Sequence, residues 1–313
     1  MTARGREWTV GEDEAGTRLD RFLADAARMG SRSLAARALE RGQVFLNDEP
    51  ATLADAATRL GAGDRVRLWL DRPGSARVPR TATGDLAIVL EDRSLVVVNK
   101  PAGLLTVPLE RTPSASSVQV QLREYLRPSR CMPFVVHRID RDTSGLVLFA
   151  KSAGAQAALK AQFRRREPER VYWAVVYGRP QPAEGAWRDH LVWDDRALVQ
   201  KVTRPGDPKA TEAECRYRVV ESYDRASLIE VSLVTGKRNQ IRLQARLRGH
   251  TLVGEQRYVY GPDELRPIAF PRQALHARRL VFAHPEDGLE IRCEAEPPED
   301  FARLLSTLRR HRR

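Results

Sequence analysis

The sequence predicts an α+β protein, in which a mixed, largely antiparallel sheet follows a smaller α/β domain. The chain has 313 residues, which is enough for two domains. Residues 73–84 are rich in Pro, Gly, Ser and Thr, as linkers often are. Beyond them, short β-branched runs do not alternate regularly with helices, which argues against a doubly wound parallel sheet. We therefore expect a first domain over residues 1–72, a linker over 73–84 and a second domain over 85–313.

Two helices and two strands are expected in the first domain. Apolar residues at helical spacing around Phe22 predict the first helix. Ser31 can cap a second helix, which has an apolar inner face and can end at Gly42. The strands are expected at Gln43–Leu46 and Arg65–Leu70. In the second of these runs, charged and apolar residues alternate with period two, as in a half-buried strand.

The second domain shows six β-branched or apolar runs and two helical segments. Strands are expected at Leu86–Leu90, Leu95–Asn99, Pro133–Ile139, Leu146–Ala150, Arg170–Tyr177 and Ala226–Val234, and helices at Ser116–Leu126 and Ser152–Arg165.

Charge and composition narrow the class of protein. The 53 Lys and Arg against 41 Asp and Glu give a net charge of +12, which attracts polyanions such as nucleic acid, although a solvated cationic surface would look the same. No apolar run is long enough to cross a membrane, and the first residues lack an apolar signal core, so we expect a cytoplasmic protein. Neither the cysteines nor the histidines show metal-ligand spacing, so no metal is expected.

One segment, His137 to Gly145, is dense in chemically reactive side chains and lies between two apolar runs. Loops between strands often display catalytic groups. An ordinary hairpin turn is the alternative, because Asp, Thr, Ser and Gly all favour turns. An aspartic protease would need a second carboxylate loop that shares a proton with the first, and the sequence offers none.

This segment resembles the catalytic signature of the RluA-type ribosomal pseudouridine synthases, which usually reads His-Arg-Leu-Asp-x-x-Thr-Ser-Gly. Further blocks resemble that family in the same order, namely Leu95–Gly103, Arg170–Val175, Gly236–Arg242, Ala274–Ala277 and His284-Pro285. The first domain resembles the alpha-L RNA-binding domain first seen in small-subunit ribosomal protein four. The resemblance covers about Gly16–Leu70 and Asp85–Leu305.

The resemblance implies an isomerase that converts uridine in RNA to pseudouridine, with Asp140 as its catalytic carboxylate. Nothing is oxidised and no group is imported, so no cofactor is expected. Arg242 would keep that carboxylate ionised, the alternative being a surface cation on a strand. Tyr172 would stack on the uracil, the alternative being a core tyrosine. Arg138 could hold a phosphate or fill the space left by a flipped base, or could be a solvated charge.

Three arginines mark the predicted second helix as a surface for RNA phosphates, with a purely structural basic helix as the alternative: Arg32, Arg37 and Arg41. RNA is the expected partner, and no membrane or obligate protein partner is indicated. Large-subunit ribosomal RNA is the expected substrate. Transfer RNA, or a non-catalytic role in ribosome assembly, stays an alternative.

The chain departs from the usual family pattern at three places. Lys237, Arg238 and Asn239 replace Arg-Thr-His before Gln240, Gln244 stands where His is common, and Glu255 follows Gly254 where Asp is common. These changes leave Asp140, Tyr172 and Arg242 in place, so we expect them to alter which RNA is recognised rather than the chemistry.

Overall fold

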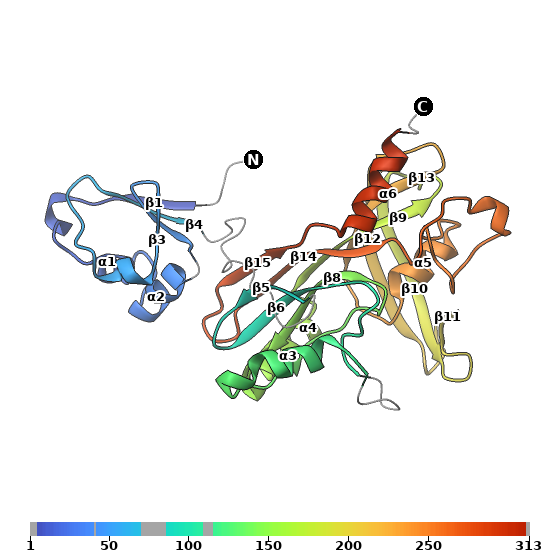
Figure 1. Ribbon diagram of the computed structural model, residues 1–313, viewed down its shortest axis with the longest axis horizontal. Helices are drawn as coiled ribbons and strands as arrows, with labels where there is room; N and C mark the ends of the chain where they lie inside the picture. Colours follow the sequence, from blue (N-terminus) through green and yellow to red (C-terminus); the bar gives the residue numbers. More distant parts are fainter. Residues whose placement is uncertain (1–4, 41, 70–85, 109–114, 311–313) are drawn as a thin grey trace.

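The structure is a computed structural model that describes residues 5–40, 42–69, 86–108 and 115–310. Its N-terminal part is a four-stranded antiparallel sheet in the order β1-β4-β2-β3, drawn in blue in Figure 1. The elements are β1 (Gly5–Thr9), η1 (Glu12–Glu14), α1 (Leu19–Leu23), α2 (Arg32–Glu40), β2 (Val44–Leu46), β3 (Glu49–Ala51), η2 (Leu53–Ala57) and β4 (Arg65–Trp69). Helices and sheet share one apolar core.

The boundaries of α2 follow from its sequence. The Ser31 hydroxyl accepts a hydrogen bond from the Leu34 amide at 3.3 Å, as the capping prediction requires. Ala38 and Leu39 are buried against the sheet. Gly42 has a φ of 61°, which glycine adopts without strain just beyond a helix. The predicted second helix is therefore confirmed.

The rest of the chain forms a sheet of eleven strands, with the path β11-β10-β12-β13-β9-β14-β8-β6-β5 and with β15 and β7 beside β14 and β8. The strands are β5 (Ala87–Glu91), β6 (Leu95–Lys100), β7 (Phe134–Val135), β8 (Ser144–Ala150), β9 (Glu169–Tyr177), β10 (Glu184–Asp194), β11 (Val199–Thr203), β12 (Thr211–Ser222), β13 (Ala226–Leu233), β14 (Leu275–Ala283) and β15 (Glu290–Glu294). Among the described strands only β14 and β8 pair in parallel, so the largely antiparallel α+β prediction is confirmed.

Helices cover both faces of the large sheet, as Figure 1 shows. They are α3 (Val118–Leu126), α4 (Ala153–Arg164), α5 (Gln240–Leu247) and α6 (Glu299–Arg310), with the short turns η3 (Arg127–Ser129) and η4 (Asp263–Leu265). Alternate residues of β6 point to opposite faces: Val96 and Val98 share a core with α3, whereas Leu95 and Val97 share one with α4. Burial on both sides explains why this strand is a continuous apolar run.

Two sequence predictions were wrong in detail. Pro133–Ile139 was expected to be one strand, but only Phe134–Val135 is β7. The Thr106 hydroxyl bonds both backbone groups of Ile139, at 2.9 and 3.3 Å, so this segment satisfies its backbone without a ladder. Arg242 was considered for a strand, but it lies in α5. The predicted linker at 73–84 lies outside the described residues.

Candidate active site

Asp140 lies in the loop between β7 and β8, beside the parallel pairing of β8 with β14. Lys100, a fully buried side chain at the end of β6, anchors this loop. Its ammonium nitrogen donates to the Pro101, Leu104 and Arg141 carbonyls at 2.7–2.8 Å. Lys100 is thus a structural anchor that joins the end of β6 to the Asp140 loop.

Gly145 explains how β8 can approach β14 so closely. It has a φ of 111°, and a Cβ atom placed there would lie 2.3 Å from the Ala277 carbonyl oxygen. Only glycine fits this position without displacing the backbone of β14. The strand that follows Asp140 therefore depends on the glycine that ends the predicted signature.

The carboxylate of Asp140 accepts two hydrogen bonds on the same oxygen. Arg242 Nη1 lies 3.0 Å from Asp140 Oδ2, and Asn239 Nδ2 lies 2.7 Å from it. Within the described part of the chain, no partner is found for Oδ1. One oxygen is therefore held and the other is left open, with the carboxylate side chain 26% exposed.

Arg242 is itself fixed by Glu255, whose side chain is completely buried. Glu255 accepts from Nε and Nη2 of Arg242 at 2.6 and 2.7 Å, a bidentate pair. It also accepts from the Arg257 and Tyr258 amides. The guanidinium thus bridges two carboxylates, with its planar fork directed by Glu255 toward Asp140.

The pKa values in this network follow from burial and from the paired charges. Burial alone would raise the pKa of Glu255, but the hydrogen bonds and charge of Arg242 outweigh it and lower that pKa below 4.5. Burial would lower the pKa of Arg242, and Glu255 and Asp140 raise it instead. Both groups therefore stay charged at neutral pH.

Tyr172 lies on β9, between β13 and β14, and is 7% exposed. Burial, and then the charge of Asp140, raise the pKa of its hydroxyl, while Arg170 opposes them, so the phenol stays protonated. Tyr172, Asp140, Arg242 and Arg138 line one open cavity of about 820 Å³. The structure thus brings together the four residues that the sequence suggested for the substrate site.

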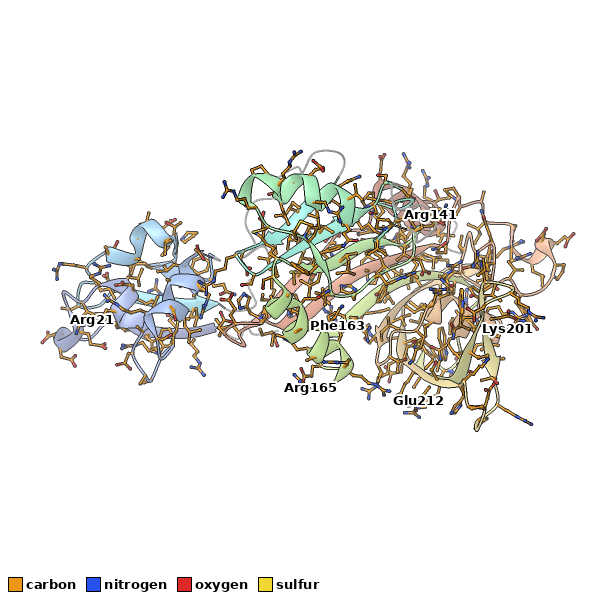
Figure 2. All side chains as sticks on the ribbon, turned by 90° about the horizontal axis from the view of Figure 1, so that it is seen from below. Arg21, Arg141, Phe163, Arg165, Lys201 and Glu212 are labelled. Atoms are coloured by element: carbon orange, nitrogen blue, oxygen red, sulfur yellow. The ribbon has the colours of Figure 1, made fainter. Side chains whose placement is uncertain are left out.

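Cations surround this cavity. Helix α4 contributes the exposed Lys160 and Arg164 to its lining, and Lys237 from the turn before α5 also lines it. Phe163 of α4, labelled in Figure 2, stacks on His137 with ring centroids 4.9 Å apart. His137 also accepts from the Leu148 amide at 3.1 Å, and burial, with Arg170, lowers its pKa to about 3. His137 is therefore neutral and structural.

The three arginines of the predicted RNA surface have different environments. Arg32 is 63% exposed and lies 3.6 Å from Asp20. Arg37 is 18% exposed and pairs with Asp287, beyond β14, at 2.6 Å. The structure thus places Arg37 in a contact between α2 and the turn that joins β14 to β15. Arg41 lies outside the described residues.

Asn239 and Glu255 are site residues that the sequence analysis did not assign. Both appeared there only as departures from a family pattern. Their signal was spacing: Asn239 lies one turn before Arg242, and Glu255 follows a glycine at a turn with a φ of 75°. Neither spacing reveals that Asn239 bonds Asp140, 99 residues earlier in the chain, or that Glu255 bonds Arg242.

Within the described ranges, no cluster of three or more His, Cys, Asp or Glu side chains could hold a metal ion. In the same ranges, no helix combines the length and the apolar character that crossing a membrane requires.

The fold and this site define an enzyme that acts on RNA. The profile of the family described as RNA pseudouridylate synthase matches residues 94–247. A ribosomal large subunit pseudouridine synthase D from Zymomonas mobilis is 35% identical, covering 96% of both chains. A synthase C from Pasteurella multocida is 29% identical, covering 96% of this chain and 93% of its own. Human RNA pseudouridylate synthase domain containing 4, at 23% identity and a TM-score of 0.58, covers 71% of this chain and 92% of its own and shares the fold.

The chain therefore belongs to the RluA-type RNA pseudouridine synthase family, as the signature around Asp140 indicated. It is an isomerase that converts uridine in RNA to pseudouridine.

Proposed function

We propose that this protein modifies uridines of large-subunit ribosomal RNA, with Asp140 as the nucleophilic carboxylate. The observation that carries the assignment of Asp140 is its asymmetric environment: Arg242 and Asn239 bond one oxygen, and the other oxygen has no partner in the described residues. The assignment of the RNA rests on relatives that are named for the large ribosomal subunit.

The reaction breaks the bond between N1 of uracil and C1′ of ribose, and forms a bond from C5 to C1′. The proton that leaves C5 is balanced by one gained at N1, so no atom is added or lost. A carboxylate nucleophile can divide this exchange into two easier steps. Arg242 would orient the carboxylate, since its charged donor binds Oδ2 and leaves Oδ1 available to a substrate in the cavity that Asp140 lines.

Tyr172 and Arg138 would handle the base and its surroundings. The ring of Tyr172 lines the cavity with its phenol protonated, so it can stack on uracil and donate a hydrogen bond. The target uridine must leave its stack to enter the cavity. The exposed Arg138 at the cavity lining would contact the RNA around that base.

The N-terminal sheet with α1 and α2 would act as an RNA-binding domain in the cytoplasm. Arg32 remains exposed enough to contact a phosphate. Arg37 would instead set the position of this domain, because its guanidinium is paired with Asp287. A domain of this kind would add affinity that falls with salt and would add little base specificity.

The experiment compares the wild-type protein with Asp140→Asn on purified ribosomal and transfer RNA. Carbodiimide-blocked primer extension maps each pseudouridine. We expect the wild type to modify large-subunit RNA and the variant to form no product while its unfolding temperature stays within a few degrees. Product from Asp140→Asn would overturn the carboxylate assignment. Product only in transfer RNA would overturn the assignment of large-subunit ribosomal RNA as the substrate.

A further inference from the structure

Asn239 has a backbone and a side chain that its position before α5 does not require. Its φ of 53° and ψ of 24° lie in the left-handed region, which asparagine tolerates better than most residues. Its side chain makes no capping hydrogen bond to α5. Instead the amide spans from Asp140 to Tyr258, donating at 2.7 Å and accepting at 3.2 Å.

Tyr258 fixes which way this amide points. Its hydroxyl oxygen accepts from the Gln200 amide of β11 at 2.8 Å, and the side chain is 6% exposed. A phenol has one proton to donate, and that proton is therefore directed to Asn239 Oδ1. With Oδ1 committed to Tyr258, the NH₂ group of Asn239 must face Asp140.

Several charged groups lie near Asp140. The groups near it are Arg242 and Asn239 at α5, Glu255 and Tyr258 after that helix, Tyr172 on β9, Lys100 at the end of β6, and the neighbours Arg141 and Asp142. Arg242 is shared between Asp140 and the buried Glu255, so one guanidinium faces two carboxylates. Asn239 supplies a second donor to Oδ2 of Asp140 without adding another charge.

We propose that Asn239, oriented by Tyr258, is a positioning residue for the Asp140 carboxylate. This inference rests on the proposed function, in which Asp140 is the nucleophile. Asn239 and Arg242 converge on Oδ2 from the same end of α5, and together they fix the rotation of the carboxylate and leave Oδ1 available in the cavity that Asp140 lines. Asn239 replaces the usual histidine of the family signature, so the donor does not titrate.

The test uses Asn239→Gly and Tyr258→Phe in the full chain. Glycine accepts the left-handed backbone, so Asn239→Gly removes the side chain without backbone strain. Leu198→Gly is a matched control, since Leu198 also has a φ of 53° and its side chain is exposed in the turn between β10 and β11. Single-turnover rates and RNA binding are measured from pH 5 to pH 9 for each protein.

We expect Asn239→Gly to lower the single-turnover rate about 10- to 100-fold, the range for one hydrogen bond to a charged group. RNA affinity should stay within about twofold across the measured pH range, so that the loss falls on the single-turnover rate rather than on binding. Tyr258→Phe should lower the rate by a smaller factor, and should have no further effect in the Asn239→Gly background. Leu198→Gly should match the wild type.

An unchanged single-turnover rate in Asn239→Gly, or a loss confined to RNA affinity or unfolding temperature, would overturn the positioning role. If Asn239→Gly does not fold, Tyr258→Phe decides by the same two readouts. Asp140→Asn tests the proposed function separately from the role of Asn239. An active Asp140→Asn overturns the proposed function, whereas an inactive Asp140→Asn with a fully active Asn239→Gly overturns only the role of Asn239.

Discussion

The ion pair between Arg242 and Glu255 allows a quantitative prediction for Arg242→Met, which keeps most of the apolar stem but removes the charge. Glu255 is completely buried and loses its only cationic partner among the described residues, whereas Asp140 is 26% exposed and can regain water. Removing one partner of a buried pair costs about 3–5 kcal/mol when the other stays charged. Glu255 can escape that cost by taking up a proton.

Protonation sets an upper limit on the electrostatic loss. Taking up a proton costs about 1.4 kcal/mol for each pH unit above the ordinary pKa of 4.5, so the limit is about 3.4 kcal/mol at pH 7 and about 1.4 kcal/mol at pH 5.5. In the wild type the pKa of Glu255 is lowered, so its stabilisation is present above pH 4.5. In Arg242→Met that pKa is raised, so the difference between the two proteins widens as pH rises.

Urea denaturation at pH 5.5 and pH 7 measures this difference in the free energy of unfolding of the part that contains the large sheet. The double variant Arg242→Met/Glu255→Leu is the control. We expect Arg242→Met to lose roughly 3 kcal/mol at pH 7 and about half of that at pH 5.5. The double variant should recover most of the stability and none of the activity. A loss that does not depend on pH, or that persists in the double variant, would refute the electrostatic reasoning. Recovered activity would refute the role of Arg242.

Three further outcomes follow from the loop and strands around Asp140. Gly145→Ala should lower the free energy of unfolding by roughly 3 kcal/mol or more, because its Cβ would meet the Ala277 carbonyl; a urea midpoint near that of the wild type would contradict this. Lys100→Met leaves three carbonyls without their donor, and should lower the free energy of unfolding by roughly 2–4 kcal/mol in the same assay. A loss below about 1 kcal/mol would show that this anchor is dispensable. His137 has a pKa of about 3 in the folded protein, below its ordinary value of 6.5, so the unfolded chain takes up the proton at a higher pH than the folded protein does. The free energy of unfolding should therefore fall as pH drops from 6.5 toward 3, with a loss of about 2 kcal/mol at pH 5. His137→Gln should flatten that fall, and an equal slope in both proteins would exclude His137 as its source.

The sequence predicted the elements whose pattern has one physical interpretation. β6 is a continuous apolar run because both of its faces are covered, and α2 is bounded by a capping serine and a terminal glycine. Helix α5 was ambiguous because Ile241-Arg242-Leu243 alternates like a strand over a short span. Its buried face also includes Gln240 and Gln244, whose polar side chains hide the helical period.

Contacts between distant segments were outside the reach of pattern reasoning. Helical spacing predicts that Arg37 and Arg41 share a face, but spacing does not say what covers that face. In the structure Arg37 meets Asp287, which lies 250 residues later in the chain. The same applies to Asn239, since nothing local to its block points to Asp140. Such partners are set by the order of strands in the sheet, which places β8 beside β14 and α5 beside the resulting loop.

The departures from the family pattern are therefore linked in space, although they are scattered in sequence. Asn239 bonds Asp140 directly, and Glu255 holds Arg242 against it. Gln244 accepts from Gln240 at 3.0 Å, and Gln240 in turn accepts from the Lys237 amide, which fixes the turn that carries Asn239. A replacement at one of these positions changes the hydrogen-bonding needs of the others. We therefore expect the three departures to act on the orientation of the carboxylate as a unit, and their single substitutions to be non-additive.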